Sequence, residues 1–212
     1  MKVGILGSST VAQSLAAGFI KYNNQVMLSS RTPAKLTEWV QKSPGSKAGS
    51  FSEAAAFGDI IVLAVKGMVA ADVLNAAGID NLKDKIVIDA TNPIADQAPE
   101  KGILNFFTSF KESLMEQLQK AYPQVKFVKA FSSVGSASMV NPRFKGGKPT
   151  MFICGNDNTA KNKITEILDQ FGWETEDMGD AEAARAIEPL CILWCIPGFL
   201  RNDWVHAFKM LR

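Results

Sequence analysis

Short apolar runs recur along the chain and alternate with segments in which apolar residues lie three or four positions apart. A run that is apolar throughout is typical of a parallel strand covered on both faces, and the wider spacing is typical of a helix with one buried face. The expected strands are 3–6, 25–28, 47–51, 59–65, 85–89, 125–130, 150–154 and 173–177. The alternation predicts an α/β protein with a doubly wound, mostly parallel sheet and right-handed crossovers.

Helices are expected between these strands. The segment 158–171 is the clearest of them, and Gly172 follows it at the position where a left-handed residue ends a helix. The segment 109–120 reads as an amphipathic helix, and its spacing predicts that Phe110, Leu114 and Leu118 face the core.

The first strand passes through a tight turn directly into a helix. In a dinucleotide-binding turn the free N–H groups at the helix start face a pyrophosphate, and the usual spacing is G-x-G-x-x-G. Here the three positions are Gly7, Ser9 and Ala12, so only the first glycine is present. Ser9 still permits close backbone approach and adds a hydroxyl for a phosphate oxygen. The alternative is a strand, turn and helix without a ligand.

The end of the second strand offers positive charge. In this type of sheet that position faces the adenosine ribose, where an acidic residue favours NAD, whereas a Ser and an Arg can neutralise a 2′-phosphate. Ser30 and Arg31 occupy it, and Lys35 follows one helical turn later. The pattern favours NADP. The alternative is that Arg31 and Lys35 are ordinary solvated charges near a helix start.

Three further segments follow the carboxyl ends of predicted strands, where ligands bind in open parallel sheets. Lys66-Gly67-Met68 follows one strand, Ala90-Thr91-Asn92-Pro93 the next, and the hydroxyl-rich segment 131–137 the one after that. These segments are therefore expected at the same edge as the glycine-poor turn.

Composition narrows the classes of partner. The chain has 212 residues, a net charge of +2, 21% charged and 47% hydrophobic residues, which gives no electrostatic case for nucleic acid or an anionic membrane. One domain, or one core plus a small appendage, is expected. The three cysteines show no paired metal spacing and the chain opens on a strand, which suggests a reducing cytoplasm and no resident metal. Pro189 to Leu200 is too short to span a bilayer, so no membrane segment is expected.

The tail from Asp180 reads as helical, with breaks at Pro189 and at Pro197-Gly198. Its aromatic residues exceed what a short helix needs for its own packing, which favours an interface, and hence a homodimer, that also borders the site. They are Trp194, Phe199, Trp204 and Phe208.

No residue stands out as a catalytic acid, base or nucleophile. His206 is expected to be structural or at the surface, and Cys191 and Cys195 are expected to be buried small hydrophobes rather than a redox pair. Glu182, Arg185 and Glu188 lie at helical spacing and read as a solvated ladder of charges.

With these motifs placed, nearly the whole chain resembles the deazaflavin (coenzyme F420)-dependent NADP reductase family of small bacterial Rossmann proteins. It is also similar to the cofactor domain of eukaryotic membrane-bound metalloreductases. The most specific segments are Ser30-Arg31 with Lys35, the turn 89–93 and the segment 129–135. The sequence departs from the family at the glycine-poor turn and at Lys66-Gly67, where a proline and an aromatic residue are usual.

The resemblance implies an NADP-binding Rossmann-type domain at 1–178 and a helical tail at 179–212 that packs on it or on a partner subunit. It implies a cofactor site with four parts: Gly7, Ser8, Ser9, Thr10 and Val11 at the pyrophosphate; Ser30, Arg31 and Lys35 at the 2′-phosphate; Ala64, Val65 and Lys66 beside the second ribose and nicotinamide; and Thr91, Asn92, Val134 and Gly135 on the far side.

The function implied is hydride transfer between NADP(H) and a small-molecule acceptor, either a flat ring such as a deazaflavin or flavin or a small imine or carbonyl. This reaction needs positioning and a dry cleft rather than an acid or a base. The alternative is a non-catalytic NADPH-binding sensor or regulatory subunit, because the fold alone does not separate the two.

Overall fold

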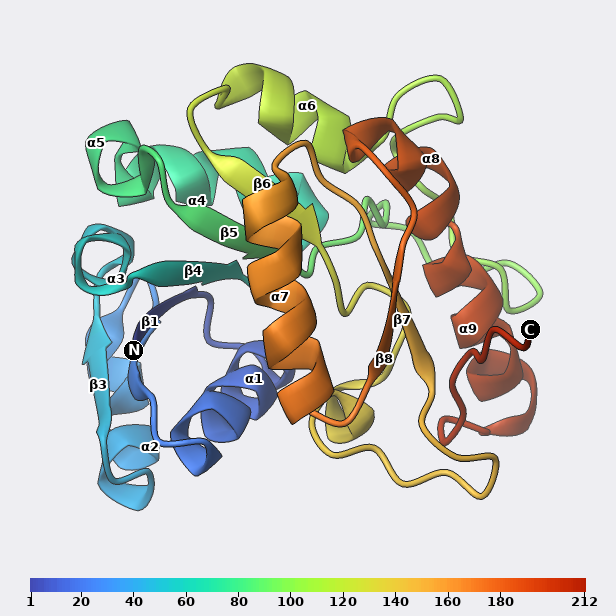
Figure 1. Cartoon of the computed structure of the whole chain (residues 1–212), viewed down its shortest axis with the longest axis horizontal. Coiled ribbons are helices and arrows are strands. Elements are labelled where there is room, and N and C mark those ends of the chain that lie inside the picture. The colour runs from blue at the N-terminus through green and yellow to red at the C-terminus, as the bar shows by residue number, and fades with distance from the viewer.

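A computed structural model describes all residues, 1–212, and its centre is a six-stranded parallel sheet (Figure 1). The strand order is β3-β2-β1-β4-β5-β6. From β1 the chain adds β2 and β3 on one side, and it then crosses back to add β4, β5 and β6 on the other side, so the order of the strands reverses between β1 and β4. This reversal leaves a crevice at the carboxyl ends of the strands, and the doubly wound prediction is confirmed. The strands are β1 (Lys2–Leu6), β2 (Gln25–Ser29), β3 (Ser46–Gly49), β4 (Ile60–Leu63), β5 (Ile86–Asp89) and β6 (Lys126–Lys129).

Both faces of this sheet are covered, which explains why its central strands are apolar throughout. In β4, Ile60 and Val62 join one core cluster, whereas Ile61 and Leu63 join the other. The first cluster is completed by α1 (Thr10–Lys21) and α7 (Asn158–Gln170). The second is completed by α3 (Phe51–Phe57), α4 (Ala70–Ala77), α5 (Ile79–Leu82), α6 (Leu114–Ala121) and α8 (Ala184–Ile187).

The remaining elements are short, apart from α9. They are α2 (Thr37–Lys42), α9 (Leu190–Arg201) and the 3-10 helices η1 (Pro33–Leu36), η2 (Gly67–Val69), η3 (Ser136–Ser138) and η4 (Ala181–Ala183).

A second, two-stranded parallel sheet pairs β7 (Thr150–Ile153) with β8 (Glu174–Asp177). It lies between α7 and α9 in Figure 1. Gly172, just after α7, has a φ of +90°, so the predicted left-handed helix end is confirmed. Trp173 is fully buried and donates its indole N–H to the carbonyl of Met139 at 2.8 Å, which anchors the start of β8.

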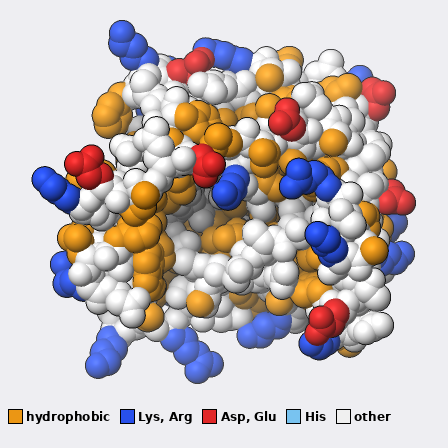
Figure 2. Space-filling model, turned by 180° about the vertical axis from the view of Figure 1, so that it is seen from behind, with side chains coloured by type: hydrophobic (Ala, Val, Ile, Leu, Met, Phe, Trp, Pro, Cys, Tyr) orange, Lys and Arg blue, Asp and Glu red, His pale blue; other side chains and the backbone are white.

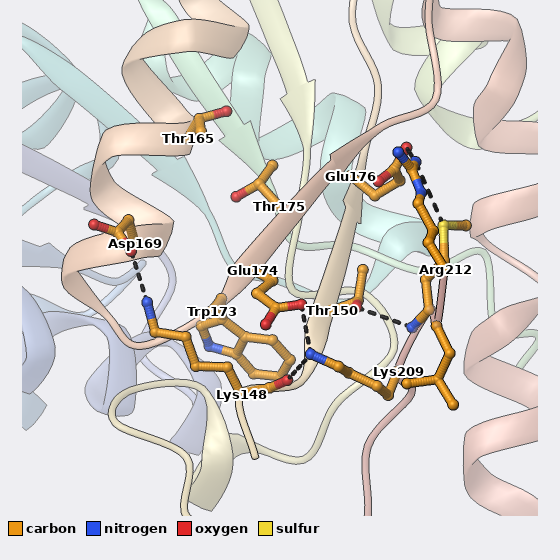
Figure 3. Close-up of a pocket in the computed structure, with 12 residues that line it drawn as sticks. Lys148, Thr150, Thr165, Asp169, Trp173, Glu174, Thr175, Glu176, Lys209 and Arg212 are labelled. Atoms are coloured by element: carbon orange, nitrogen blue, oxygen red, sulfur yellow. Dashed lines mark hydrogen bonds and ion pairs between the residues drawn. The ribbon is translucent and has the colours of Figure 1, made fainter. Parts of the chain in front are cut away.

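The last residues, 202–212, form an extended strap that returns along β7. The N–H of Thr150 donates to the carbonyl of Phe208 at 2.9 Å, and the N–H of Met210 donates to the Thr150 hydroxyl at 3.0 Å. Lys209 pairs with Glu174, and Arg212 pairs with Glu176. The strap thereby borders a groove of about 650 Å³ against α7 and β8, whose charged side chains neutralise one another in pairs (Figure 3).

Three expectations about helices were wrong. The 109–120 helix begins only at Leu114, because Ser113 and Glu116 form a capping box there, and Phe110 is 81% exposed in the preceding loop rather than in the core. Pro197-Gly198 does not interrupt α9, which continues to Arg201 because its buried face, including Trp194 and Cys195, packs on the protein. The tail is not helical beyond that residue.

One stretch, Ala181–Arg201, is long and apolar enough to cross a membrane by length and composition alone. A core helix passes the same test, and 33% of the apolar 18-residue window within this stretch is buried. Ala184 and Ile187 pack in the second core cluster and Trp194 shares a small cluster with Leu104, so part of the apolar surface of this stretch is covered within the protein.

Candidate functional site

The carboxyl ends of the central strands lie in register. Leu6 pairs with Ser29 on one side and with Leu63 on the other, and Asp89 links Leu63 to Lys129. The segments that follow these residues therefore meet at one edge of the sheet. The structure places all the predicted site segments there, in the order of the strands: residues 30–35, 7–11, 64–66, 91–92 and 134–135.

The first turn is fixed by close backbone contact. Gly7 has a φ of +137°, and a Cβ atom there would lie 2.3 Å from the carbonyl oxygen of Ala64, so only glycine fits. Ser9 is the N-cap of α1, where its hydroxyl accepts from Ala12 N–H at 3.4 Å, and the N–H of Gln13 donates to the Ser9 carbonyl at 2.9 Å. The N–H groups of Thr10 and Val11 remain directed out of the helix end, as an anion requires.

The side chains of this turn have unequal roles. Ser9 and Thr10 are exposed, and the Ser8 carbonyl accepts from the Gln13 amide at 3.0 Å. Val11 packs partly against the first core cluster, so it offers its backbone rather than its side chain. The Ser9 hydroxyl also donates to the Ala64 carbonyl at 3.4 Å, a long contact that a ligand oxygen could replace.

The cationic side chains beside this turn have no partner in the protein. Arg31 and Lys35 are exposed and take part in no ion pair or hydrogen bond with their side chains, whereas Ser30 accepts from the N–H of Thr32 at 3.1 Å. Because Ser29 lies directly opposite Leu6, Ser30 and Arg31 begin next to Gly7. Two unpaired cations next to a helix N-terminus attract a phosphorylated ligand.

On the other side of the turn, the segments after β4 and β5 touch. A Cβ atom on Gly67 would lie 2.2 Å from the Asn92 carbonyl oxygen, so this glycine permits close packing. Ala64 is buried, Val65 is half-buried and Lys66 is exposed. The glycine that departs from the family pattern therefore has a structural reason.

Asn92 is held by one end of its amide. Its Nδ2 donates to the carbonyl of Ser132 at 2.7 Å, while its Oδ1 is buried without a hydrogen-bond partner. A buried acceptor of this kind is costly unless a ligand satisfies it. Val134 is buried in the first core cluster, and a Cβ on Gly135 would lie 2.8 Å from the Trp194 ring, so α9 packs against the segment 134–135.

A buried ion network underlies this half of the site. Lys129 is fully buried and lies 2.7 Å from Asp89 and 2.9 Å from Glu188, measured from Nζ to the carboxylate oxygens. Burial alone would lower the pKa of Lys129, but the two carboxylates raise it above its ordinary value, so the ammonium stays charged.

The solvated ladder expected for the tail was therefore wrong at Glu188, whereas Arg185, with 41% of its side chain exposed, is partly solvated. Glu188 is 1% exposed, and Arg185 forms hydrogen bonds with the buried Glu116. Sequence reasoning missed Asp89, Lys129 and Glu188 as site-supporting residues. A signal was present, because Asp89 and Lys129 are charged residues that close two neighbouring apolar strands at aligned ends.

The other chemically notable residues support the tail. His206 contacts the Trp194 carbonyl through Nε2 at 2.9 Å, and its ring stacks on that indole with centroids 5.0 Å apart. Cys191 and Cys195 are buried, as expected. A hydrogen bond with Cys195, together with burial, raises the pKa of the Cys191 thiol.

The rear face of the molecule is hollowed near its centre, with hydrophobic side chains inside and both basic and acidic side chains close to its rim (Figure 2). A hollow of this composition suits a ligand with flat rings and phosphate groups.

Comparisons with known proteins agree with this geometry. A crystal structure of a protein from Arthrobacter sp. FB24, described as a candidate F420-dependent NADP reductase, is 30% identical with a TM-score of 0.93, and each chain is covered completely. An imine reductase from Streptomyces aurantiacus shares the fold at 14% identity and a TM-score of 0.71, over 94% of this chain and 63% of that one.

Two curated relatives are much longer than this chain. Rat metalloreductase STEAP3 is 31% identical over 94% of this chain, and human metalloreductase STEAP2 is 25% identical over 89% of it. The chain spans only 39% and 35% of their respective lengths. The family model described as NADP oxidoreductase, coenzyme F420-dependent, matches residues 2–93, which include the turn, the Ser30-Arg31 pair and Asn92. On these matches and on its end-to-end likeness to the Arthrobacter protein, the chain belongs to the F420-dependent NADP oxidoreductase family.

Proposed function

We propose that this protein is an NADP(H)-dependent oxidoreductase that transfers a hydride between the nicotinamide and a flat acceptor such as a deazaflavin or flavin, or a small imine or carbonyl compound. The observation that carries the proposal is the pair of exposed, unpaired cations, Arg31 and Lys35, beside the open N-terminus of α1. A 2′-phosphate is the group that this pair would distinguish from the bare ribose of NAD.

The residues present fit NADP at both ends. The free N–H groups of Thr10 and Val11 would bind the pyrophosphate, Arg31 and Lys35 the 2′-phosphate, and the unpartnered Oδ1 of Asn92 a donor on the nicotinamide half. The bound nicotinamide supplies or accepts the hydride. The protein contributes orientation and exclusion of water, and no side chain is required as an acid or a base.

The acceptor would lie between the end of the sheet and the tail. Trp194 closes this side, because its ring lies against Gly135 on one side and against His206 on another. Trp194 is only 7% exposed and stacks on His206, so it shapes this side of the site without offering a free face to a ring. The preference for a deazaflavin or flavin is supported by the family match.

Removal of Arg31 tests the phosphate assignment. Arg31→Ala should weaken NADPH binding by about 1.5–3 kcal/mol, the usual value for a lost charge-assisted hydrogen bond, and leave NADH binding almost unchanged. Isothermal titration calorimetry with both cofactors measures this. Lys42→Ala is the matched control, because Lys42 is an exposed cation whose partner is Glu38 on the same helix. Equal losses for NADPH and NADH would contradict the 2′-phosphate role.

Turnover separates the enzyme from the alternative, a non-catalytic NADPH-binding sensor. NADPH oxidation is followed by absorbance with a deazaflavin, FMN, FAD and ferric chelates as acceptors. Turnover with any of them supports the oxidoreductase. Tight NADPH binding with no turnover supports the sensor.

We also propose that the protein forms a homodimer through its tail. Several apolar side chains of this segment are exposed: Leu193 (55%), Phe199 (43%), Leu200 (56%) and Val205 (75%). Exposed apolar residues gathered on one segment are typical of an interface. Trp204 is less exposed and packs on Gly198 and Phe199, so it supports the shape of this surface.

Light scattering after size exclusion tests the dimer. The wild type should elute as a dimer, and Leu200→Glu should convert it to a monomer at micromolar concentration, because a charge is buried without a partner. Trp204→Ala should weaken the dimer too. Leu211→Glu, at a residue exposed by 83% near the end of the strap, is the control that should remain dimeric. A monomeric wild type would refute the proposal.

A further inference from the structure

The buried network of Asp89, Lys129 and Glu188 contacts the nicotinamide half of the proposed site through Thr91, which precedes Asn92. We propose that Glu188, in the tail, is a positioning residue that fixes the Thr91–Asn92 turn and the Trp194 side of the site relative to each other. This inference rests on the proposed function and extends it to residues that touch no ligand themselves.

The turn itself is held by both of its charged neighbours. The Asp89 carboxylate accepts from the backbone N–H of Thr91 at 2.9 Å and from its hydroxyl at 2.6 Å. Lys129 donates to the Thr91 carbonyl at 3.0 Å. Every polar group of Thr91 is therefore engaged by the network, and the backbone direction that leads into Asn92 is determined by it.

Glu188 connects this turn to the rest of the site. One carboxylate oxygen of Glu188 receives the Lys129 ammonium and the N–H of Met115 at 3.0 Å, and the other receives the N–H of Leu114 at 3.0 Å. Glu188 thus joins the sheet edge, the first turn of α6 and the start of α9. Trp194 follows six positions later on α9 and meets Gly135.

Stability alone does not explain three buried charges. A buried ion pair pays a desolvation penalty that often equals its Coulombic gain, and apolar replacements are frequently as stable. The network instead supplies fixed directions, because Asp89 and Lys129 are hydrogen-bonded to the backbone of Thr91 and Glu188 is hydrogen-bonded to the backbone of α6. Such directional bonding is suited to holding a turn at the precision that hydride transfer demands.

The atom that this network positions for a ligand is Oδ1 of Asn92. With Nδ2 of Asn92 engaged by Ser132 and the turn fixed by Thr91, Oδ1 is held ready for a donor on the ligand. Two groups on the nicotinamide half of NADPH are suitable, the carboxamide N–H and a ribose hydroxyl. The adenosine half meets residues that have no bond to the network.

Glu188→Gln removes the charge and keeps the shape of the side chain. Whichever oxygen becomes the amide nitrogen, it faces a donor, either the Lys129 ammonium or a backbone N–H of α6. Calorimetry would measure the binding of NADPH and of 2′,5′-ADP, which contains only the phosphorylated adenosine half. NADPH affinity should fall about tenfold, as for one lost hydrogen bond, and 2′,5′-ADP affinity should stay within about twofold.

Glu182→Gln is the matched control, because Glu182 is an exposed carboxylate on the same tail and should leave both affinities unchanged. Asn92→Ala should reproduce the selective loss of NADPH affinity. Equal weakening of both ligands by Glu188→Gln in a folded protein, or no change in either, would overturn the inference. A wild type that binds neither ligand would refute the proposed function, and the inference would fall with it.

Hydrogen exchange of the ligand-free wild type tests the same inference without any variant. The Thr91 amide should exchange as slowly as those of β5, because Asp89 accepts from it in a buried position, whereas the Thr10 and Val11 amides should exchange rapidly. Rapid exchange at Thr91 would show that the turn is not held before the ligand binds and would overturn the inference, even if Glu188→Gln fails to fold.

Discussion

The two halves of the proposed cofactor site are built in different ways. The adenosine half depends on residues close together in sequence, namely the turn 7–11 and the exposed residues 30–35, whose cations have no partner in the protein. The nicotinamide half depends on residues from four distant segments joined by the buried Asp89–Lys129–Glu188 network. The cations of the adenosine half have no partner until a ligand binds, whereas the charged groups beneath the nicotinamide half are paired with one another.

This difference follows from what each half must do. A phosphate is bound mainly by charge and by free N–H groups, which tolerate mobile, exposed side chains. A reacting ring must be held within a fraction of an ångström, which requires rigid support. Variants in the nicotinamide half should therefore affect stability first, and variants in the adenosine half should affect binding first.

The largest expected effect is on stability, from Lys129→Met. The substitution leaves Asp89 and Glu188 buried without their common partner, and breaking a buried pair in this way typically costs about 3–5 kcal/mol. Urea unfolding measures the loss. Lys126→Met on the same strand is the control, because the Lys126–Asp157 pair at 3.2 Å is partly exposed and should cost less than about 1 kcal/mol. Similar losses for both variants would show that the buried network stabilises the fold no more than a partly exposed ion pair does.

Ser9→Leu tests the other half, where binding should change more than stability. A branched side chain beside the helix N-terminus blocks the approach of a pyrophosphate, so NADPH and NADH binding should both be abolished. Loss of the N-cap should cost only about 1 kcal/mol of folding free energy. Calorimetry and thermal unfolding on one preparation compare the two effects, and unchanged titration curves would exclude the turn from the site.

The same contrast decides what could be predicted from sequence. The strands, the left-handed Gly172 and the segments at the strand ends follow from local patterns, since an apolar run or a glycine after a helix has few alternative structures. The Arg31 and Lys35 cluster was also recognisable, because the residues lie within one helical turn.

The network was not predictable from local patterns. Glu188 contacts Lys129 and α6, which lie 59 or more positions away, and its spacing from Glu182 and Arg185 is also typical of a solvated helix face. The Phe110 error has a local cause, because the capping box of Ser113 and Glu116 starts the helix at Leu114, although the apolar spacing would extend it back to Phe110. Long-range pairing and local caps override periodicity at these positions.

The smallest effect concerns the second link between the tail and α6, the ion pair of Arg185 with Glu116. Hydrogen bonds from Arg185 lower the pKa of Glu116 from its usual 4.5 to about 2. A carboxyl group with a depressed pKa stabilises the fold above its unfolded pKa, and this contribution is lost as the pH falls from about 4.5 towards 2. Arg185→Gln should therefore cost about 1 kcal/mol at pH 7 and almost nothing near pH 2.

Urea unfolding of this variant at several pH values measures that dependence, and Arg143→Gln, at an exposed arginine with no ion pair, is the control. Because Arg185 is partly exposed and Glu188 is not, the Arg185 link should be weak and the Glu188 link strong, although both join the tail to the first turn of α6. If Arg185→Gln lowers stability as much as Lys129→Met and also weakens NADPH binding selectively, the tail is positioned by its surface ion pair. The proposal that the buried network positions the nicotinamide half would then be wrong.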